Sequence, residues 1–228
     1  MLVAIGNQKG DVGKTTLAID LACAWARQHR VLLVDADPQG SATAWLTEPG
    51  GVEITSARDP GLAAFLEAQA SHYDAVIVDT PPGLDRPLRE AIRSAGLLLV
   101  PLQPTPVDGR AVRARIELAQ ILRGTSLDVR LVLSRVQPGT ILGRTARAGL
   151  EPNGVPILRS VLTQRVAVAE AAGMGRPVFA YAPDSLAADE FTAVAREIGR
   201  EVLRHGKLDE DEARRQTSAG SALADGGG

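Results

Sequence analysis

The 228-residue sequence contains one cysteine, Cys23, and this scarcity excludes several kinds of site. A single thiol cannot form a disulfide within the chain. It also cannot supply the paired cysteines of an iron–sulfur cluster or a cysteine-bound metal. Cys23 lies in a stretch of helical apolar spacing, which favours a buried thiol over a reactive one. A reducing, cytoplasmic location is the natural expectation.

Aromatic residues and long apolar runs are also scarce. There are two Trp, two Tyr and three Phe residues, which argues against recognition of single-stranded nucleic acid by base stacking. The longest apolar run, near residues 96–100, is far shorter than the roughly 20 residues that span a bilayer. The first residues lack a charged start followed by an apolar core, so we expect no signal peptide and no membrane partner.

Lysine is nearly absent although arginine is common. Of the 25 basic residues, only three are lysines, namely Lys9, Lys14 and Lys207, and the first two lie within six positions of each other. The net charge of −2 hides an uneven distribution, because residues 1–85 carry −6 and residues 86–200 carry +6. A basic segment of this kind can mark a polyanion-binding face, and scattered solvated arginines explain it equally well.

Short runs rich in valine, isoleucine and leucine alternate with stretches of helical spacing. The expected strands cover residues 2–6, 31–35, 75–79, 97–102 and 129–133, and the expected helices cover 14–28, 61–70, 86–94 and 108–122. Nearly continuous apolar strands that alternate with helices predict an α/β fold. We expect a mostly parallel, doubly wound sheet with helices on both faces.

The last third of the chain is less regular. We expect helices at 142–148, 165–172 and 185–205, and short strands at 156–158 and 177–179. After residue 205 the chain has almost no large apolar side chains and ends in glycines. The composition therefore predicts a single domain over residues 1–205 and a disordered tail over residues 206–228.

A phosphate-binding loop is indicated where the first expected strand ends. Residues 7–16 read NQKGDVGKTT between a strand and a helix, an arrangement in which backbone N–H groups bind phosphate. Lys14 would contact the β- and γ-phosphates of a nucleotide, and the Thr15 hydroxyl would bind Mg²⁺. Gln8 stands where the pattern G-x-x-x-x-G-K-[ST] has glycine, so a chance turn is the alternative. The expected nucleotide contacts are Lys9, Gly10, Asp11, Val12, Gly13, Lys14, Thr15 and Thr16.

The extra lysine of this loop carries a family resemblance. Lys9, Gly10, Gly13, Lys14 and Thr15 resemble K-G-G-x-G-K-[ST], the deviant Walker A box of the ParA/MinD family of P-loop ATPases. The resemblance implies a P-loop NTPase fold and catalytic roles for both lysines. It also implies that Lys9 crosses a dimer interface to the phosphates of the partner's nucleotide.

Two further boxes follow in the family's order. Residues 31–40, VLLVDADPQG, are similar to its second box, which implies that Asp37 positions the hydrolytic water and that Asp35 lies near the Mg²⁺ shell. Residues 73–82, YDAVIVDTPP, resemble its Walker B strand, which implies that Asp79 holds Mg²⁺ through water. Taken alone, each segment would be interpreted as a helix cap or a turn. Together the boxes imply ATP or ADP and Mg²⁺ as cofactors.

The resemblance covers roughly residues 1–200 and favours the partition subgroup, ParA/Soj-like or ParF-like. Residues 165–171 resemble its R-x-x-x-x-E-A stretch. Iron-protein-like members need paired cysteines, tyrosine-kinase members need a tyrosine-rich tail, and MinD-like members need an amphipathic membrane helix that residues 206–228 do not provide. Larger partition ATPases carry a helix-turn-helix domain before the phosphate loop. Because the loop starts at residue 7 here, we expect no such domain.

This subgroup implies a homodimer that forms with ATP, binds double-stranded DNA without sequence preference, and is released when a ParB-like partner or cargo adaptor stimulates hydrolysis. It also implies a cytoplasmic protein that associates with the nucleoid when ATP is bound. Arg165 matches a family position linked to DNA contact, and charge alone suggests Arg159, Arg196 and Arg200. Each of these is otherwise an exposed helix arginine.

Asp11 departs from the family, which has glycine there. A side chain enters a loop meant for close phosphate approach, at a backbone position that favours glycine. A negative charge also stands near the triphosphate, where a like-charge contact at about 4 Å costs about 4 kcal/mol at an effective dielectric near 20. We hypothesise that Asp11 impairs ATP-driven dimerisation or hydrolysis, and the alternative is a solvent-facing side chain with little effect.

Two other functions stay open at this point. One is a nucleotide-binding regulatory module with negligible turnover, and the other is a small-molecule synthetase of the dethiobiotin synthetase type, which lacks a residue like Lys9. Adenine contacts are expected at Ser134 and Arg135 or in the loop at residues 182–184.

Overall fold

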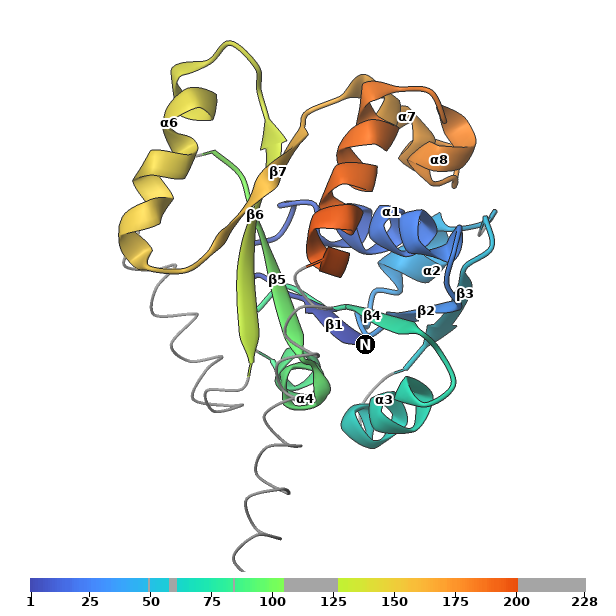
Figure 1. Ribbon diagram of the computed structural model, residues 1–228. Helices are drawn as coiled ribbons and strands as arrows, with labels where there is room; N and C mark the ends of the chain where they lie inside the picture. Colours follow the sequence, from blue (N-terminus) through green and yellow to red (C-terminus); the bar gives the residue numbers. More distant parts are fainter. Residues whose placement is uncertain (49, 58–60, 84, 105–126, 201–228) are drawn as a thin grey trace, which may run out of the picture.

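The computed structural model describes residues 1–48, 50–57, 61–83, 85–104 and 127–200, and at its centre lies a seven-stranded sheet (Figure 1). The strands are β1 (Leu2–Ile5), β2 (Val31–Asp35), β3 (Glu53–Ser56), β4 (Ala75–Asp79), β5 (Leu97–Leu102), β6 (Asp128–Val136) and β7 (Ile157–Thr163). Their order is β3-β2-β4-β1-β5-β6-β7, and all neighbouring strands are parallel. The predicted parallel α/β sheet is confirmed.

Helices cover both faces of this sheet. They are α1 (Lys14–Ala26), α2 (Ser41–Trp45), α3 (Leu62–Ala70), α4 (Arg86–Ser94), α6 (Ile141–Leu150), α7 (Val166–Gly173) and α8 (Val178–Tyr181), with a short 3₁₀ turn at Glu151–Asn153. A C-terminal helix is described over residues 186–200. In Figure 1, α3 and α4 lie on one side of the sheet, and α1, α2, α7 and α8 lie on the other.

Strand β1 shows how a short segment serves both halves of the core. Val3 and Ile5 pack into the cluster that contains α1 and the C-terminal helix, whereas Leu2 and Ala4 pack into the cluster that contains α3 and α4. All four side chains are buried. Successive side chains of a strand point to opposite faces, so a strand covered on both faces is apolar throughout. This explains why the central strands appear in the sequence as continuous apolar runs.

Two elements had no sequence prediction. Strand β3 lies at the edge of the sheet, and its side chains are half-buried or exposed, so EITS contains no apolar run. Helix α2 has only five residues and follows Gly40, whose φ of 66° is left-handed. Both elements are too short or too exposed to leave a periodic apolar signal.

The strand predicted at residues 177–179 is wrong, because Pro177 is the N-cap of α8 and the next two residues begin the helix. Pro177 precedes the helix, and the backbone N–H of Val178 donates to the Asp20 carboxylate of α1 at 2.8 Å. This contact joins residues 158 positions apart, so the local sequence does not reveal it. The strand expected at 156–158 is present in longer form as β7.

Some predictions fall on other parts of the chain. The helix predicted at 108–122 and the tail predicted at 206–228 lie outside the described residues. Within the described ranges, no helix is both long enough and apolar enough to cross a bilayer. Cys23 is buried as expected, and burial raises the pKa of its thiol.

Candidate nucleotide-binding site

The predicted phosphate loop joins β1 to α1 at the carboxyl edge of the sheet. Gly13 precedes α1 with φ 88° and ψ 28°, a left-handed conformation that glycine adopts without strain. A Cβ atom at Gly13 would lie 3.0 Å from the hydroxyl oxygen of Ser134, so space is also limited. The backbone N–H groups in the first turn of α1, directly after Gly13, have no partners within the helix and can bind an anion. Thr15 and Thr16 lie in this turn and are half-buried.

Side-chain hydrogen bonds fix the start of the loop to both neighbours of β1. The buried Asn7 donates its amide to the Pro101 carbonyl of β5 at 2.7 Å and accepts the Lys9 N–H at 3.0 Å. Thr80, directly after β4, donates its hydroxyl to the Ile5 carbonyl at 2.7 Å. Asn7 and Thr80 had no predicted role. The structure shows that they set where the loop leaves the sheet.

Asp11 has φ 56°, which confirms the expectation of a backbone angle that favours glycine. Its side chain is exposed, and Gly10 beside it is exposed too. The Gln103 amide donates to the Asp11 carbonyl oxygen at 2.6 Å. Val12 is buried in the protein interior, so its backbone rather than its side chain is available to a nucleotide.

The two loop lysines lie in different surroundings. Lys14 is buried, and its ammonium group donates to the Lys9 carbonyl at 3.3 Å, whereas the Lys9 side chain is exposed. Burial lowers the pKa of Lys14, and three nearby carboxylates oppose that shift, those of Asp79, Asp37 and Asp11. Lys14 is therefore held inside the loop near the carboxylates, and the charge of Asp11 reaches it.

Asp79, at the end of β4, is fully buried. Neither carboxylate oxygen has a hydrogen-bond partner of normal geometry among the described residues. Burial raises the pKa of Asp79 to about 7, with the neighbouring Asp35 carboxylate adding to the shift, while the Thr15 hydroxyl and Lys14 oppose it. A buried carboxylate without partners is costly unless a cation or donor satisfies it. These oxygens therefore fit the water shell of a bound Mg²⁺.

Asp35 has the opposite environment. One carboxylate oxygen accepts the Asp37 N–H at 3.1 Å, and the other accepts the Thr43 N–H at 2.8 Å and the Thr43 hydroxyl at 2.9 Å. Asp35 thus holds the first turn of α2 and the residues before it. Asp37 is largely buried, and its carboxylate accepts the Gln39 N–H at 2.9 Å. Thr43 had no predicted role, and no local pattern links it to Asp35.

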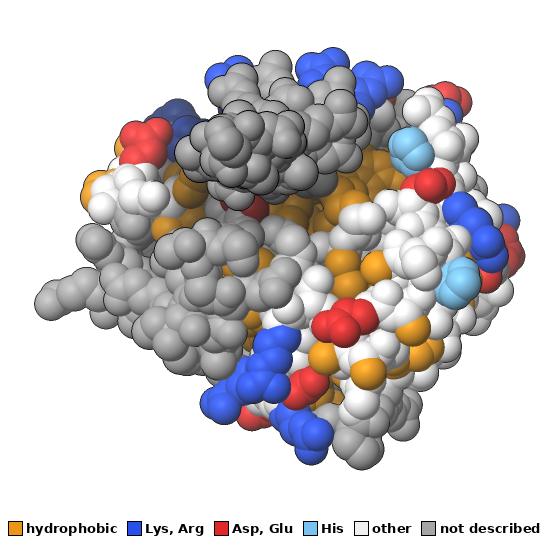
Figure 2. Space-filling view, turned by 60° about the horizontal axis from the view of Figure 1, so that its bottom comes forward, with side chains coloured by type: hydrophobic (Ala, Val, Ile, Leu, Met, Phe, Trp, Pro, Cys, Tyr) orange, Lys and Arg blue, Asp and Glu red, His pale blue; other side chains and the backbone are white. Residues whose placement is uncertain are grey.

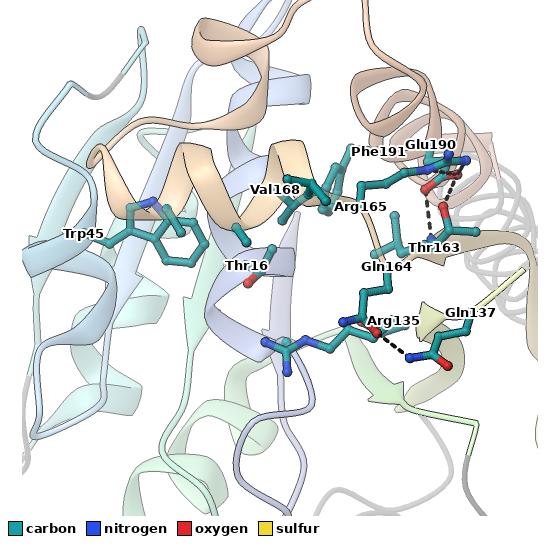
Figure 3. A pocket seen from close by; sticks show the side chains of 16 residues that line it. Thr16, Trp45, Arg135, Gln137, Thr163, Gln164, Arg165, Val168, Glu190 and Phe191 are labelled. Carbon is teal, nitrogen blue, oxygen red and sulfur yellow. Dashed lines mark hydrogen bonds and ion pairs between the residues drawn. The ribbon is translucent and has the colours of Figure 1, made fainter.

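A cleft of about 670 Å³ opens beside the start of α1 (Figure 3). Gly13 and Thr16 line it from the loop and α1, and Ser134 and Arg135 line it from β6. Figure 3 shows Arg135 lying across the cleft with its guanidinium toward the side of Thr16. Arg135 has φ 52°, which is rare for a residue other than glycine. Of the two regions expected to contact adenine, the pair Ser134 and Arg135 lines this cleft and residues 182–184 do not.

Arg165 also lines the cleft, and it is already paired. Its guanidinium contacts Glu190 at 2.7 Å, and Glu190 also accepts the Thr163 N–H at 2.9 Å. Figure 3 shows these three side chains joined above the Gln164–Gln137 pair. The predicted DNA contact at Arg165 stays a prediction, and its charge is partly neutralised by Glu190.

The other predicted DNA-binding arginines are exposed. Arg196 and Arg200 border a groove of about 430 Å³ together with Arg27 and His29 at the end of α1. Arg159 lies elsewhere, in β7, where its backbone N–H donates to Glu197. Arg196 and Arg200 therefore share one groove, Arg159 contacts Glu197 next to Arg196 on the C-terminal helix, and Arg165 pairs with Glu190 of the same helix. On the face shown in Figure 2, basic, acidic and hydrophobic side chains are interspersed.

Sequence comparison finds relatives over most of the chain. Residues 3–178 match the family described as the CobQ/CobB/MinD/ParA nucleotide binding domain. The chain is 36% identical over 209 residues to the maintenance of carboxysome distribution protein A of Gloeobacter kilaueensis, covering 88% of this chain and 94% of the relative. It is 30% identical to the chromosome-partitioning ATPase Soj of Thermus thermophilus, covering 86% and 94% of the two chains.

Structural comparison agrees on the fold. The septum site-determining protein MinD of Pyrococcus horikoshii, solved with Mg-ADP, superposes with a TM-score of 0.72 at 20% sequence identity. The match covers 86% of this chain and 95% of the MinD chain. At this level of identity the likeness concerns the fold alone.

Proposed function

The chain belongs to the CobQ/CobB/MinD/ParA nucleotide-binding family, and we propose that it is an ATP-hydrolysing switch that positions or partitions DNA or another cellular cargo. The observation that carries this proposal is the loop of residues 7–16 at the end of β1. Gly13 has a left-handed backbone, the buried Lys14 follows it, and the Asp79 carboxylate lies close enough to act on Lys14 while its oxygens lack hydrogen bonds of normal geometry among the described residues. That combination suits the phosphates and metal of a nucleotide.

Nucleotide binding would use the backbone of the loop and the first turn of α1. Lys14 would exchange its bond to the Lys9 carbonyl for the phosphates, and the Thr15 hydroxyl and Asp79 would hold Mg²⁺, with water between the metal and Asp79. When bound, Mg²⁺ neutralises charge that develops on the phosphates. Asp37 would orient the attacking water. Asp35 would act indirectly, because its oxygens already hold Asp37 and Thr43 in place.

The base and ribose would occupy the cleft beside Thr16. This placement is supported by the cleft's position directly behind the first turn of α1, and by Ser134 and Arg135 on its other wall. The exposed Lys9 suits the role that the family resemblance implies, contact with the nucleotide of a second copy in an ATP-dependent homodimer. We also propose that residues 1–205 form one ATPase domain and that residues 206–228 are a disordered tail.

DNA binding without sequence preference would be the output of the ATP-bound dimer, in the cytoplasm and on the nucleoid. Such binding needs several cationic side chains placed along the DNA phosphates, and it does not need a uniformly basic face. The net charge of +6 over residues 86–200 supplies them, and Arg165, Arg159, Arg196 and Arg200 are the proposed contacts. The names of the two relatives, which refer to carboxysome distribution and chromosome partitioning, support a positioning or partition role. The partner that stimulates hydrolysis would be a ParB-like protein or a cargo adaptor, as the family resemblance implies.

Two measurements test this function. A gel shift on random duplex DNA should show binding with ATP and much less with ADP. Replacing Arg196 or Arg200 by alanine should reduce the salt dependence of binding by about one unit per lost phosphate contact. Arg93, which pairs with Glu90 on the opposite side of the sheet in α4, provides the matched control. Equal affinity with ATP and ADP would refute the switch.

One observation favours a second function, a nucleotide-binding regulatory module with negligible turnover. Asp11 is a residue with a Cβ atom in a left-handed backbone conformation. Its carboxylate also places a negative charge close enough to Lys14 to affect the pKa of that lysine. Both effects weaken phosphate binding. Single-turnover hydrolysis of ATP with and without DNA separates the two functions, because the module would bind nucleotide and fail to release phosphate.

A further inference from the structure

The outer part of the phosphate loop has little packing to hold its shape. Lys9, Gly10 and Asp11 are exposed, and a Cβ atom placed on Gly10 would meet nothing within 4 Å. Side-chain hydrogen bonds replace packing here. Asn7 accepts the Lys9 N–H, Lys14 donates to the Lys9 carbonyl, and Gln103 donates to the Asp11 carbonyl. Among the hydrogen bonds of the described residues, the one to residue 11 comes from Gln103.

Gln103 is well placed to act as a fixed point. It directly follows β5, which is hydrogen-bonded to β1 on one side and to β6 on the other. The preceding residues Pro101 and Leu102 are buried, and Pro101 is also the residue that anchors Asn7. The end of β5 therefore holds the loop by two hydrogen bonds. One joins Pro101 to Asn7 at the start of the loop, and the other joins Gln103 to Asp11 at its outer bend.

With aspartate at position 11, the left-handed backbone depends more on this hydrogen bond than it would with the family's glycine. Aspartate tolerates the left-handed conformation better than most residues with a Cβ atom, yet glycine adopts it freely, and one hydrogen bond is of the size needed to offset that difference. Without the Gln103 bond, the peptide after Asp11 is free to rotate to an ordinary backbone angle. The N–H groups that follow would then no longer point into the phosphate site.

We propose that Gln103 is a positioning residue that holds the Asp11 peptide in its left-handed conformation and thereby allows a phosphate loop with aspartate at this position to bind nucleotide. The inference rests on the proposed function, because the loop is assumed to bind phosphate. It assigns Gln103 a role that depends on what stands at residue 11. That dependence makes it testable.

The test is a double-mutant cycle read out as the dissociation constant of Mg-ADP. The four chains are the parent, Gln103→Met, Asp11→Gly and the double variant; methionine keeps the length of glutamine and removes the donor. We expect Gln103→Met to weaken binding about tenfold in the parent and about twofold or less beside Asp11→Gly. Equal factors in both backgrounds would overturn the proposal, since a merely structural role would not depend on residue 11.

Two controls keep the result interpretable. Gln69→Met replaces a half-buried glutamine of α3, which packs on the opposite face of the sheet from α1, and should leave Mg-ADP binding unchanged. If neither the parent nor Asp11→Gly binds Mg-ADP, the proposed function fails. The cycle is then read from amide hydrogen exchange of residues 9–13 in the ligand-free chains. Faster exchange caused by Gln103→Met in the parent but not beside Asp11→Gly supports the positioning role, and equal acceleration refutes it.

Discussion

Asp35 and Asp79 are direct partners in the register of β2 and β4, yet their carboxylates have opposite environments. Asp35 accepts hydrogen bonds from Asp37 and Thr43 at both oxygens, and Asp79 accepts none of normal geometry from the described residues. Both side chains are fully buried. One carboxylate is therefore part of the framework, and the other is available to a cation. Substitution of the two should have effects of opposite sign.

Replacing Asp79 by asparagine should raise the melting temperature of the ligand-free chain near neutral pH, because burial disfavours the carboxylate more than its neighbours Thr15 and Lys14 favour it. The same change should weaken the additional stabilisation that Mg²⁺ gives beyond ADP alone, since the proposed metal contact is lost. Thermal unfolding with ADP, with and without Mg²⁺, measures both effects. An unchanged response to Mg²⁺ would exclude Asp79 from the metal site.

Replacing Asp35 by asparagine should instead destabilise the ligand-free chain, by about 1–3 kcal/mol. Both oxygens accept backbone N–H groups, so either orientation of the new amide turns an NH₂ group toward a donor. Urea unfolding of the two variants side by side gives the comparison. A stability equal to that of the parent would show that the contacts with Thr43 and Asp37 contribute little.

Replacing Asp11 by glycine should increase Mg-ATP affinity and ATP turnover by about tenfold. The change removes a strained left-handed residue and a negative charge near Lys14, each of which disfavours phosphate binding. Steady-state hydrolysis and DNA binding with ATP are the measurements. Values equal to those of the parent would mean that Asp11 is harmless where it stands.

Asp20 should make the stability of the chain dependent on pH. Burial raises its pKa to about 7, opposed by the hydrogen bond from the Val178 N–H, whereas an unfolded aspartate titrates near 4. Between these values the folded chain holds a proton that the unfolded chain has lost. The free energy of unfolding therefore falls as pH rises through this window and levels off above about 7.

Replacing Asp20 by asparagine should flatten this pH dependence, because the amide does not titrate. The melting temperatures at about pH 5 and about pH 8 give the slope, and Asp79 contributes a further part with the same sign. Asp189→Asn, at an exposed position of the C-terminal helix, should leave the slope as it is in the parent. A slope that survives in Asp20→Asn would exclude Asp20 as its source.

Replacing Gly175 by alanine should destabilise the chain by at least about 1–2 kcal/mol. Gly175 has φ +68°, and a Cβ atom there would lie 2.4 Å from the Thr47 hydroxyl oxygen and 3.0 Å from the Trp45 carbonyl oxygen. Gly173→Ala is the matched control, because a Cβ atom at Gly173 meets nothing within 4 Å. Urea unfolding should separate the two variants clearly, and similar stabilities would contradict the steric argument.

The fold class and the position of the candidate site follow from local features of the sequence. Strands covered on both faces are apolar along their whole length, and the residues of the phosphate loop are neighbours in the chain, so both signals are local. The short α2 and the exposed edge strand β3 carry no such signal. The strand predicted at residues 177–179 was wrong. The Asp20 carboxylate of α1 accepts a hydrogen bond from the first N–H group of α8, and this contact between distant residues leaves no local signal.

The hydrogen-bond partners of each side chain in the candidate site depend on how distant segments pack, and the sequence did not predict them. The sequence places Asp35 and Asp79 alike at strand ends, whereas in the structure Asp35 accepts hydrogen bonds from Thr43 and Asp79 accepts none of normal geometry from the described residues. The sequence also singled out Asp11, but its partner Gln103 lies 92 residues away. A hydrogen bond depends on where two distant backbone segments meet. That meeting is set by the packing of the whole sheet, and no local pattern records it.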